Sequence, residues 1–333
     1  MTAPDQPTPT RFRSFYILPG TQVGTYVVRD AIGQGGGQMA YLADSQDGRT
    51  VVLKFSLYPK GEEGSPEREM HERFLRQVGF FLQLRCHPNV AHVYAHDMYP
   101  DASESGHLYM VQEWVPSTVN FLDWYRKEPR TLENVLAGFI ALGTLCAEMH
   151  QRGICHRDLK PENILMVLPG GPKLIDFDSG WALGTEPITA PGAGRWPGTK
   201  LYYSPEVCEA ILADWATMTR TPYEYRPPAD LHALGVIFYQ VLTGEYAFDA
   251  GEDDLALYQS IACQVPKRPK ALNPQVPFGL DRVTMKLLKK NPKLRYQTGY
   301  ELVDDLYPLI NTKEDWSRPF QTPAGKRPSL PSS

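Results

Sequence analysis

The chain has 333 residues, of which 42% are hydrophobic and 22% charged, a composition that supports a full hydrophobic core and excludes global disorder. Its formal net charge of −4 gives no sign of a nucleic-acid-binding surface, so we expect no nucleic-acid partner. Five scattered cysteines without a Cys-x-x-Cys pair argue against a zinc site or a disulfide framework and favour a reducing cytoplasm.

We expect no membrane segment, because no apolar run approaches the roughly 18 residues that a span needs and no basic-then-apolar leader opens the sequence. The richest run, 135–149, contains Thr144 and Glu148 and is expected to be a buried helix. Proline-bearing residues 1–20 predict a flexible tail, and Pro- and Ser-bearing residues 311–333 predict a disordered one. The globular part is then 21–310.

Strand-like segments flank a glycine run from Gly33 to Gly37. Glycines let the backbone approach phosphates closely and present N–H donors to them, although a plain flexible hairpin would contain the same run. The next strand, 51–55, is apolar except for Lys54. A lone lysine on such a strand is costly unless it meets an anion.

Apolar residues at helical spacing predict a helix over 66–84. A strand reaching residue 94 and another over 108–115 should follow, and then helices over 121–127 and 132–151. After these helices the sequence reads His156-Arg157-Asp158-Leu159-Lys160-Pro161-Glu162-Asn163.

This string places a carboxylate (Asp158), an ammonium (Lys160) and an amide (Asn163) on one short loop. The carboxylate can accept the proton of an attacking hydroxyl, and the lysine can neutralise a moving phosphoryl group. Asp176 ends a later apolar strand and is well placed to share a metal ion with Asn163. A solvated surface turn is the alternative for a lone His-Arg-Asp.

The eight-residue string resembles the catalytic loop of protein kinases, with wording closest to bacterial members. The resemblance covers about residues 24–310, with motifs in family order. It implies an α+β, two-lobed fold: a small β-rich N-lobe of about 21–114 with one main helix, and a larger, mainly helical C-lobe of about 115–310.

The resemblance implies a serine/threonine protein kinase that uses ATP and Mg²⁺, with Mn²⁺ as an alternative ion. Asp158 would orient and deprotonate a Ser or Thr hydroxyl of a protein substrate, and Lys160 would steady the γ-phosphoryl group. Asn163 and Asp176 would hold the metal. Gln112 would be the gatekeeper beside the adenine, and Glu113 to Val115 the hinge. The implied ATP-binding residues are Ile32, Gly33, Gly35, Gly36, Ala40, Val52, Lys54, Gln112, Glu113, Val115, Leu165 and Asp176.

Three positions depart from the family pattern. Gln38 replaces the third glycine, Gln77 the helix glutamate that pairs with Lys54, and Asp178 the glycine of Asp-Phe-Gly. They motivate an alternative, a pseudokinase that acts as a nucleotide-binding or scaffolding module, which the retained phosphate and metal residues oppose. A small-molecule kinase is disfavoured by Ser204-Pro205-Glu206, which resembles a peptide-docking segment.

The resemblance also implies supporting contacts. Thr199 would bond Asp158 and Lys160, Arg295 would pair with Glu206, and the buried Asp230 would accept from the backbone of the catalytic loop. Thr185 and Thr189 are candidate phosphorylation sites whose phosphate Arg157 could receive, with an unmodified loop as the alternative. The longer stretch 214–228 is expected to be an ordinary packed excursion, with a partner surface as the alternative. The oligomeric state stays open.

Overall fold

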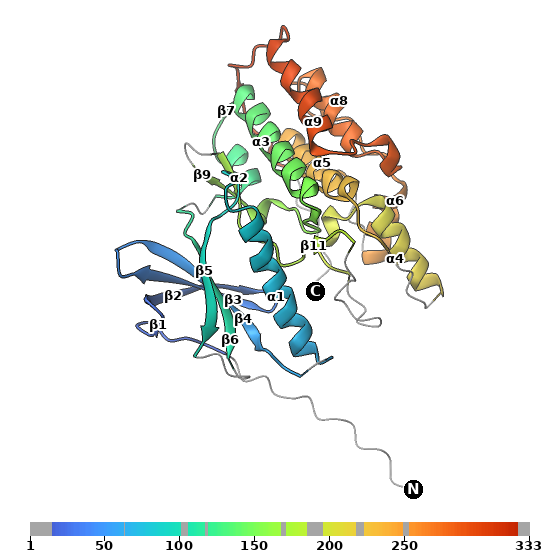
Figure 1. The fold of residues 1–333 in the computed structure, drawn as a ribbon. Coiled ribbons are helices and arrows are strands. Elements are labelled where there is room, and N and C mark those ends of the chain that lie inside the picture. Colours follow the sequence, from blue (N-terminus) through green and yellow to red (C-terminus); the bar gives the residue numbers. More distant parts are fainter. Residues whose placement is uncertain are drawn as a thin grey trace. The chain divides into compact units, whose positions relative to one another are not determined.

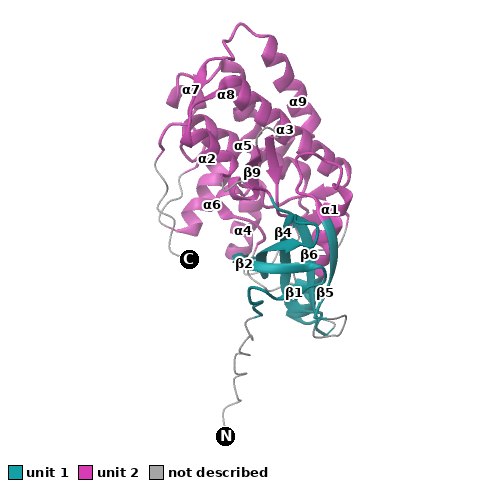
Figure 2. Cartoon of the chain, turned by 90° about the vertical axis from the view of Figure 1, so that its left-hand side faces the viewer, with its two compact units in different colours: residues 1–71, 94–114 teal, residues 72–93, 115–333 magenta. Residues whose placement is uncertain are grey.

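The computed structural model describes residues 15–62, 64–100, 106–116, 119–167, 171–184, 196–217, 223–248 and 253–325. The chain divides into two compact units, coloured separately in Figure 2: residues 1–71 with 94–114, and residues 72–93 with 115–333. The first unit is rich in β-structure and the second is mainly helical, which confirms the predicted fold class. Residues 72–93, which we had expected in the N-lobe, belong to the helical unit.

The β-rich unit is built on a six-stranded sheet with the order β1-β2-β3-β4-β6-β5. Neighbouring strands pair antiparallel from β1 through β4 to β6. In chain order the strands are β1 (Gln22–Val23), β2 (Tyr26–Gly35), β3 (Gln38–Ser45), β4 (Thr50–Pro59), β5 (Val93–Tyr99) and β6 (His107–Glu113).

The two faces of this sheet differ in character. Directly paired residues share a face, and the face alternates along each strand. Tyr41, Leu53 and Val111 are in register and belong to the buried apolar cluster of the unit. The next set in register, Ala40, Lys54 and Met110, therefore lies on the opposite face.

The N-terminal tail is shorter than predicted. Ile17 is buried in the apolar cluster of the sheet, and its backbone N–H donates to the Tyr41 hydroxyl at 2.9 Å. Phe15 packs against Phe55, with ring centroids 5.5 Å apart. The prediction of a flexible tail over 1–20 is therefore wrong for residues 15–20, because apolar side chains at 15 and 17 find a buried partner surface.

Helix α1 (Pro66–Gln83) begins in the first unit and ends in the second. The helical unit further contains the following helices, most of them visible in Figure 1: α2 (Phe121–Lys127), α3 (Leu132–Gln151), α4 (Pro205–Thr217), α5 (Pro227–Thr243), α6 (Asp254–Cys263), α7 (Pro269–Leu272), α8 (Phe278–Leu287) and α9 (Gly299–Leu306).

Helix α3 is the long apolar helix of the sequence, and it is a core helix as predicted. It begins with a capping box, in which Thr131 accepts from the Asn134 N–H and the Asn134 side chain accepts from the Thr131 N–H. It is long and apolar enough to cross a membrane by length and composition. In the structure, however, it packs against α5 and α9, and α3 and α9 run side by side in Figure 1.

The C-terminal segment is ordered further than predicted. Strand β12 (Pro319–Phe320) pairs with β7 (Arg130–Thr131), and Phe320 is 1% exposed. Thr322 donates through its N–H to the Tyr125 carbonyl at 3.0 Å and through its hydroxyl to the Val241 carbonyl at 2.6 Å. The prediction of disorder from residue 311 is therefore wrong up to 325, because one buried aromatic ring and paired backbone groups offset the effect of proline and serine.

Candidate active site

The catalytic loop, residues 156–163, connects two short strands of the helical unit. It follows β8 (Ile154–Cys155) and ends in a 3-10 turn, η1 (Pro161–Asn163), that leads into β9 (Ile164–Val167). Pro161 suits the first position of the turn because its φ is already helical and it has no N–H to satisfy there. Strand β9 pairs with β10 (Gly171–Leu174), and this hairpin fixes the exit of the loop.

The three residues that we predicted to be catalytic lie together. The Lys160 ammonium is 2.8 Å from Asp158 Oδ2, and the Asn163 amide nitrogen donates to the Asp158 carbonyl at 2.9 Å. Lys160 also donates to the Thr199 hydroxyl at 2.9 Å. We also expected a direct bond between Thr199 and Asp158. Among the described contacts these two residues are linked only through Lys160, which donates to both.

The Asp158 carboxylate has one oxygen engaged and one ready to accept. Its side chain is 14% exposed, and its Oδ1 atom is buried without a hydrogen-bond partner in the part of the chain that the structure describes. A buried acceptor normally has a donor. The hydroxyl group of a substrate is a donor of the right kind for this atom.

Asp230, at the start of α5, holds the loop through its backbone. Its Oδ2 accepts from the His156 N–H at 2.8 Å and its Oδ1 from the Arg157 N–H at 2.9 Å, as predicted. The sequence did not reveal two further partners, His150 Nε2 at 3.0 Å and the Tyr225 hydroxyl at 3.3 Å. Burial by itself raises the pKa of Asp230, but His150, His156 and the Arg157 N–H outweigh it and leave that pKa below its ordinary value.

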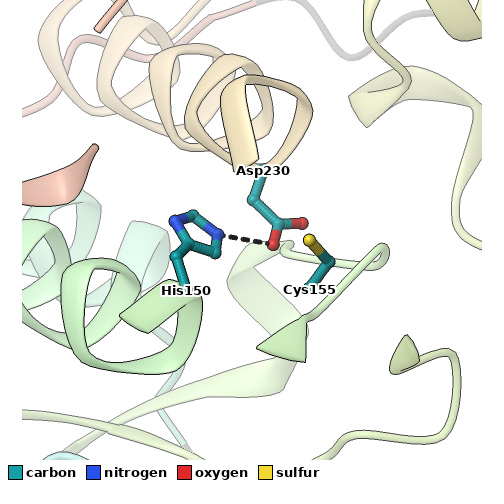
Figure 3. A group of neighbouring side chains, drawn as sticks. All are labelled: His150, Cys155 and Asp230. Carbon is teal, nitrogen blue, oxygen red and sulfur yellow. Dashed lines mark hydrogen bonds and ion pairs between the residues drawn. The ribbon is translucent and has the colours of Figure 1, made fainter. Parts of the chain in front are cut away.

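His150, Cys155 and Asp230 place potential metal ligands within 4.8 Å of one another (Figure 3). We interpret this group as a support of the loop. Both carboxylate oxygens of Asp230 already accept hydrogen bonds. Burial raises the pKa of the Cys155 thiol, so the sulfur is protonated at neutral pH and is a poor ligand.

Arg157 has a φ of 66°, the only positive φ of a non-glycine residue in the described chain. Such a conformation costs roughly 1–3 kcal/mol and persists where the surroundings determine it, here through the bond from its N–H to Asp230. Its guanidinium lies over the Tyr225 ring at 5.8 Å, and burial lowers its pKa. Thr185 and Thr189, whose phosphate we expected Arg157 to receive, lie outside the described residues.

The segments that carry the two predicted metal ligands are tied together by hydrogen bonds to the backbone. The Ile175 N–H donates to the Asn163 carbonyl at 3.0 Å, and the His156 ring bonds the Asp176 carbonyl at 2.7 Å. The Asn163 amide nitrogen is used by the loop, so the amide oxygen is the atom of this side chain that could serve as a ligand. A carboxylate and an amide oxygen are the hard ligands that Mg²⁺ and Mn²⁺ take, so these residues fit the ion.

Residues 176–178 contain the predicted metal ligand Asp176, and we call them the metal loop; side chains of α1 contact this loop. Asp176 Oδ1 accepts from the Gln77 amide and from the Asp178 N–H at 3.1 Å. The Asp178 carboxylate forms an ion pair with Arg73 at 3.1 Å. Asp178 does not adopt a positive φ, so the loop does not need glycine there. The expected bond from Gln77 to Lys54 would join the two units and stays a prediction.

Arg73 is the functional candidate that the sequence reasoning missed. It precedes Gln77 by four residues and so lies on the same helix face. That spacing, together with an unexpected carboxylate at 178, was a signal that could have predicted the pair.

The predicted ion pair between Arg295 and Glu206 is present. The Arg295 guanidinium contacts both carboxylate oxygens, at 2.8 Å and 2.5 Å, and its side chain is 0% exposed. It therefore ties the start of α4, which follows Ser204, to the turn after α8.

In the β-rich unit, four of the expected nucleotide-binding residues share one face of the sheet. Register places Ala40 beside Lys54, and Val52 beside Gln112, two positions apart and hence on one side. This is the face opposite to the apolar cluster. Their predicted contacts with ATP stay predictions.

The glycine run forms the turn between β2 and β3. Gly33 pairs with Ala40, and Gly35 with Gln38. Gly36 and Gly37 have φ values of 58° and 77°, which glycine adopts without strain. Gln38 lies in a strand and has no positive φ, so its backbone does not call for glycine. Ile32, beside the turn, is 45% exposed.

The remaining predicted nucleotide residues lie at separate places. Glu113 ends β6, Val115 is buried in the helical unit, and Leu165 lies on β9, opposite Lys173.

Residues 26–306 match the family model described as protein kinase domain. The chain is similar to the DNA damage-responsive serine/threonine-protein kinase RqkA of Deinococcus radiodurans, with 30% identity over 86% of the chain and 40% of that protein. It is also similar to the serine/threonine-protein kinases PksC of Streptomyces coelicolor (28%, 85% of the chain, 48% of the relative) and PknA of Mycobacterium tuberculosis (28%, 91% and 65%). The chain thus spans about half the length of these curated relatives.

Proposed function

Because the chain belongs to the protein kinase domain family, we propose that it is a serine/threonine protein kinase that transfers the γ-phosphoryl group of ATP to a Ser or Thr hydroxyl of a protein. The observation that carries the proposal is the Asp158–Lys160–Thr199 chain of contacts, which ends at an Asp158 Oδ1 that is buried and has no partner among the described residues. Kinase relatives named for serine/threonine activity support it.

In the proposed reaction, the substrate hydroxyl donates to Asp158 Oδ1 and passes its proton to that carboxylate. The hydroxyl oxygen forms a new bond to the γ-phosphorus while the bond from that phosphorus to the ADP oxygen breaks. Lys160, held by Asp158 and Thr199, offers its charge to the phosphoryl group. It also fixes the carboxylate so that Oδ1 keeps its direction.

The metal and the nucleotide are assigned by the same proposal. Asn163 and Asp176 would hold Mg²⁺, or Mn²⁺ in its place, and the bound ion would neutralise charge on the phosphates. Lys54 would pair with the ATP phosphates. Ala40, Val52 and Gln112 would contact the adenine from the face of the sheet that they share.

A protein substrate is proposed because Ser204-Pro205-Glu206 resembles a peptide-docking segment. Lys160 bonds Thr199 before this segment, and Arg295 pairs with Glu206 within it. We place the activity in the cytoplasm, since the described cysteines are free and three of them, Cys146, Cys155 and Cys208, are buried. The pseudokinase alternative is disfavoured because two of the departures take part in contacts at the metal loop, Gln77 with Asp176 and Asp178 with Arg73.

The test uses the purified chain with γ-labelled ATP and Mg²⁺, alone and with a generic protein substrate. Asp158→Asn should lower transfer by about 10²–10⁴-fold, the usual contribution of a general base. The matched control is Asp304→Asn, the same change at an exposed position on α9. Labelled Ser and Thr, and not Tyr, should be found by mass spectrometry. If nothing is labelled, or Asp158→Asn transfers as well as the parent, the proposal is wrong.

A further inference from the structure

Helix α1 contacts the metal loop through two side chains on one face. Arg73 and Gln77 are four residues apart and therefore neighbours on the helix surface. Gln77 donates to Asp176 Oδ1, and Arg73 contacts Asp178 Oδ2 at 3.1 Å and its carbonyl at 3.4 Å. We call Arg73, Gln77, Asp176 and Asp178 the helix–loop bridge. All four belong to the helical unit.

The bridge is sheltered from water. Gln77 is 0% exposed, and the Arg73 and Asp178 side chains are 24% and 16% exposed. An ion pair in such a place is screened less by salt than one on the open surface. It therefore keeps a preferred geometry, as a positioning contact must.

The two departures from the kinase pattern fit one another in this arrangement. A glutamate at 77 would bring a second carboxylate against Asp176 Oδ1, where an acceptor would face an acceptor. The amide of Gln77 supplies a donor instead. A glycine at 178 would remove the carboxylate that Arg73 contacts. The amide at 77 and the carboxylate at 178 therefore each supply one contact of the helix–loop bridge.

We propose that Arg73 and Gln77 are positioning residues, which hold the Asp176 carboxylate in the orientation that binds a divalent metal ion, with Asp178 as the link. The Asp178 N–H donates to the same oxygen as Gln77, so fixing Asp178 with Arg73 fixes that donor as well. The inference rests on the proposed function, because it takes Asp176 as a metal ligand.

The test measures metal binding separately from catalysis. A fluorescent ATP analogue is bound to the full chain while Mg²⁺ is titrated, and the Mg²⁺ concentration at half-maximal binding is recorded. Arg73→Gln should raise this concentration about five- to tenfold. By charge alone, removing a cation near the ion would lower it, so the direction of the shift distinguishes positioning from electrostatics.

The matched control is Arg76→Gln, which removes the same charge from the same helix. Arg76 makes no hydrogen bond or ion pair with the metal loop among the described contacts. Its Mg²⁺ midpoint should stay within about twofold of the parent, and Arg73→Lys should recover part of the loss. Binding of the analogue in EDTA should be the same for all variants, which would show that they are folded.

A double-mutant cycle tests whether the bridge acts as a unit. Asp178→Asn and Gln77→Met, which keep the side-chain volume, should each raise the midpoint. The variant that combines Arg73→Gln with Asp178→Asn should have a Mg²⁺ midpoint no higher than that of the worse single variant, whereas independent effects on the midpoint would multiply. Saturating Mg²⁺ should restore kcat in Arg73→Gln, because only the affinity for the ion is reduced.

Two results separate this inference from the proposed function. If the parent transfers phosphate but Arg73→Gln and Arg76→Gln have the same Mg²⁺ midpoint, the bridge has no positioning role while the kinase activity stands. If the parent neither transfers phosphate nor binds the analogue in a Mg²⁺-dependent way, the proposed function fails and takes this inference with it.

Discussion

The catalytic loop and the metal loop are held in place by different means. The fully buried Asp230 accepts hydrogen bonds from two backbone N–H groups of the catalytic loop. These bonds do not depend on which side chains the loop carries. The metal loop is held mainly by two side chains of α1, the buried Gln77 and the partly exposed Arg73. The residue that bonds the backbone can be replaced by few others, whereas a contact between two side chains can be made by several pairs of residue types.

This difference accounts for where the sequence departs from the family pattern. The catalytic loop keeps all eight residues of the motif. Two of the three departures, Gln77 and Asp178, lie in the bridge to the metal loop. Each of these two residues has its own side-chain partner, Asp176 for Gln77 and Arg73 for Asp178, whereas Asp230 bonds backbone groups that every residue type offers.

The largest expected effect comes from breaking the buried anchor. Asp230→Ala removes the acceptor of four donors, and each buried donor left without a partner costs about 1–3 kcal/mol. We expect the free energy of unfolding to fall by roughly 3–5 kcal/mol in urea titrations, with transfer activity lost. Asp304→Asn, on the exposed face of α9, should change neither. A stable and active Asp230→Ala would show that the loop holds itself.

The next effect concerns the catalytic loop itself. Lys160→Met keeps the length of the side chain but removes the contacts to Asp158 and Thr199. We expect kcat to fall about 10²-fold, equivalent to about 2.7 kcal/mol, in the labelled-ATP assay, with little change in stability because the lysine is partly exposed. A free energy of unfolding that falls by as many kcal/mol as the loss of kcat corresponds to would instead indicate a structural role.

A smaller effect should appear in acid. Because the folded-state pKa of Asp230 is below its ordinary value, its carboxylate stabilises the fold above the unfolded pKa of about 3.9. That contribution is lost as pH falls through the lower, folded pKa. Urea unfolding from pH 6 downward should show the loss in the parent. In Asp230→Asn, whose side chain cannot titrate, the free energy of unfolding should depend less on pH over the same range. The same pH dependence in both proteins would contradict the assignment.

The smallest effect should come from the side-chain bridge. Arg73→Gln should lower the free energy of unfolding by less than about 1 kcal/mol, because an ion pair between partly exposed side chains contributes little to stability. Thermal unfolding of Arg73→Gln and Arg76→Gln side by side would measure it. A loss as large as that of Asp230→Ala would abolish the contrast between the two loops.

Much of the fold could be predicted from local sequence. Helix α2 lies over 121–127 and α3 over 132–151 as predicted, since helical periodicity and caps are properties of neighbouring residues. The ends of the chain could not be predicted. Burial of Ile17 and Phe320 depends on partners such as Tyr41 that lie far away in the sequence, and composition does not reveal such partners.

By itself, the sequence determined the catalytic loop: Asp158, Lys160 and Asn163 lie within six residues, so their mutual distances follow from the motif. Only the tertiary structure decided how the departures are accommodated. Gln77 meets Asp176 across 99 positions, and Arg73 meets Asp178 across 105. No local pattern encodes such contacts, because they form only when the packing of α1 brings its donors to the carboxylates of the metal loop.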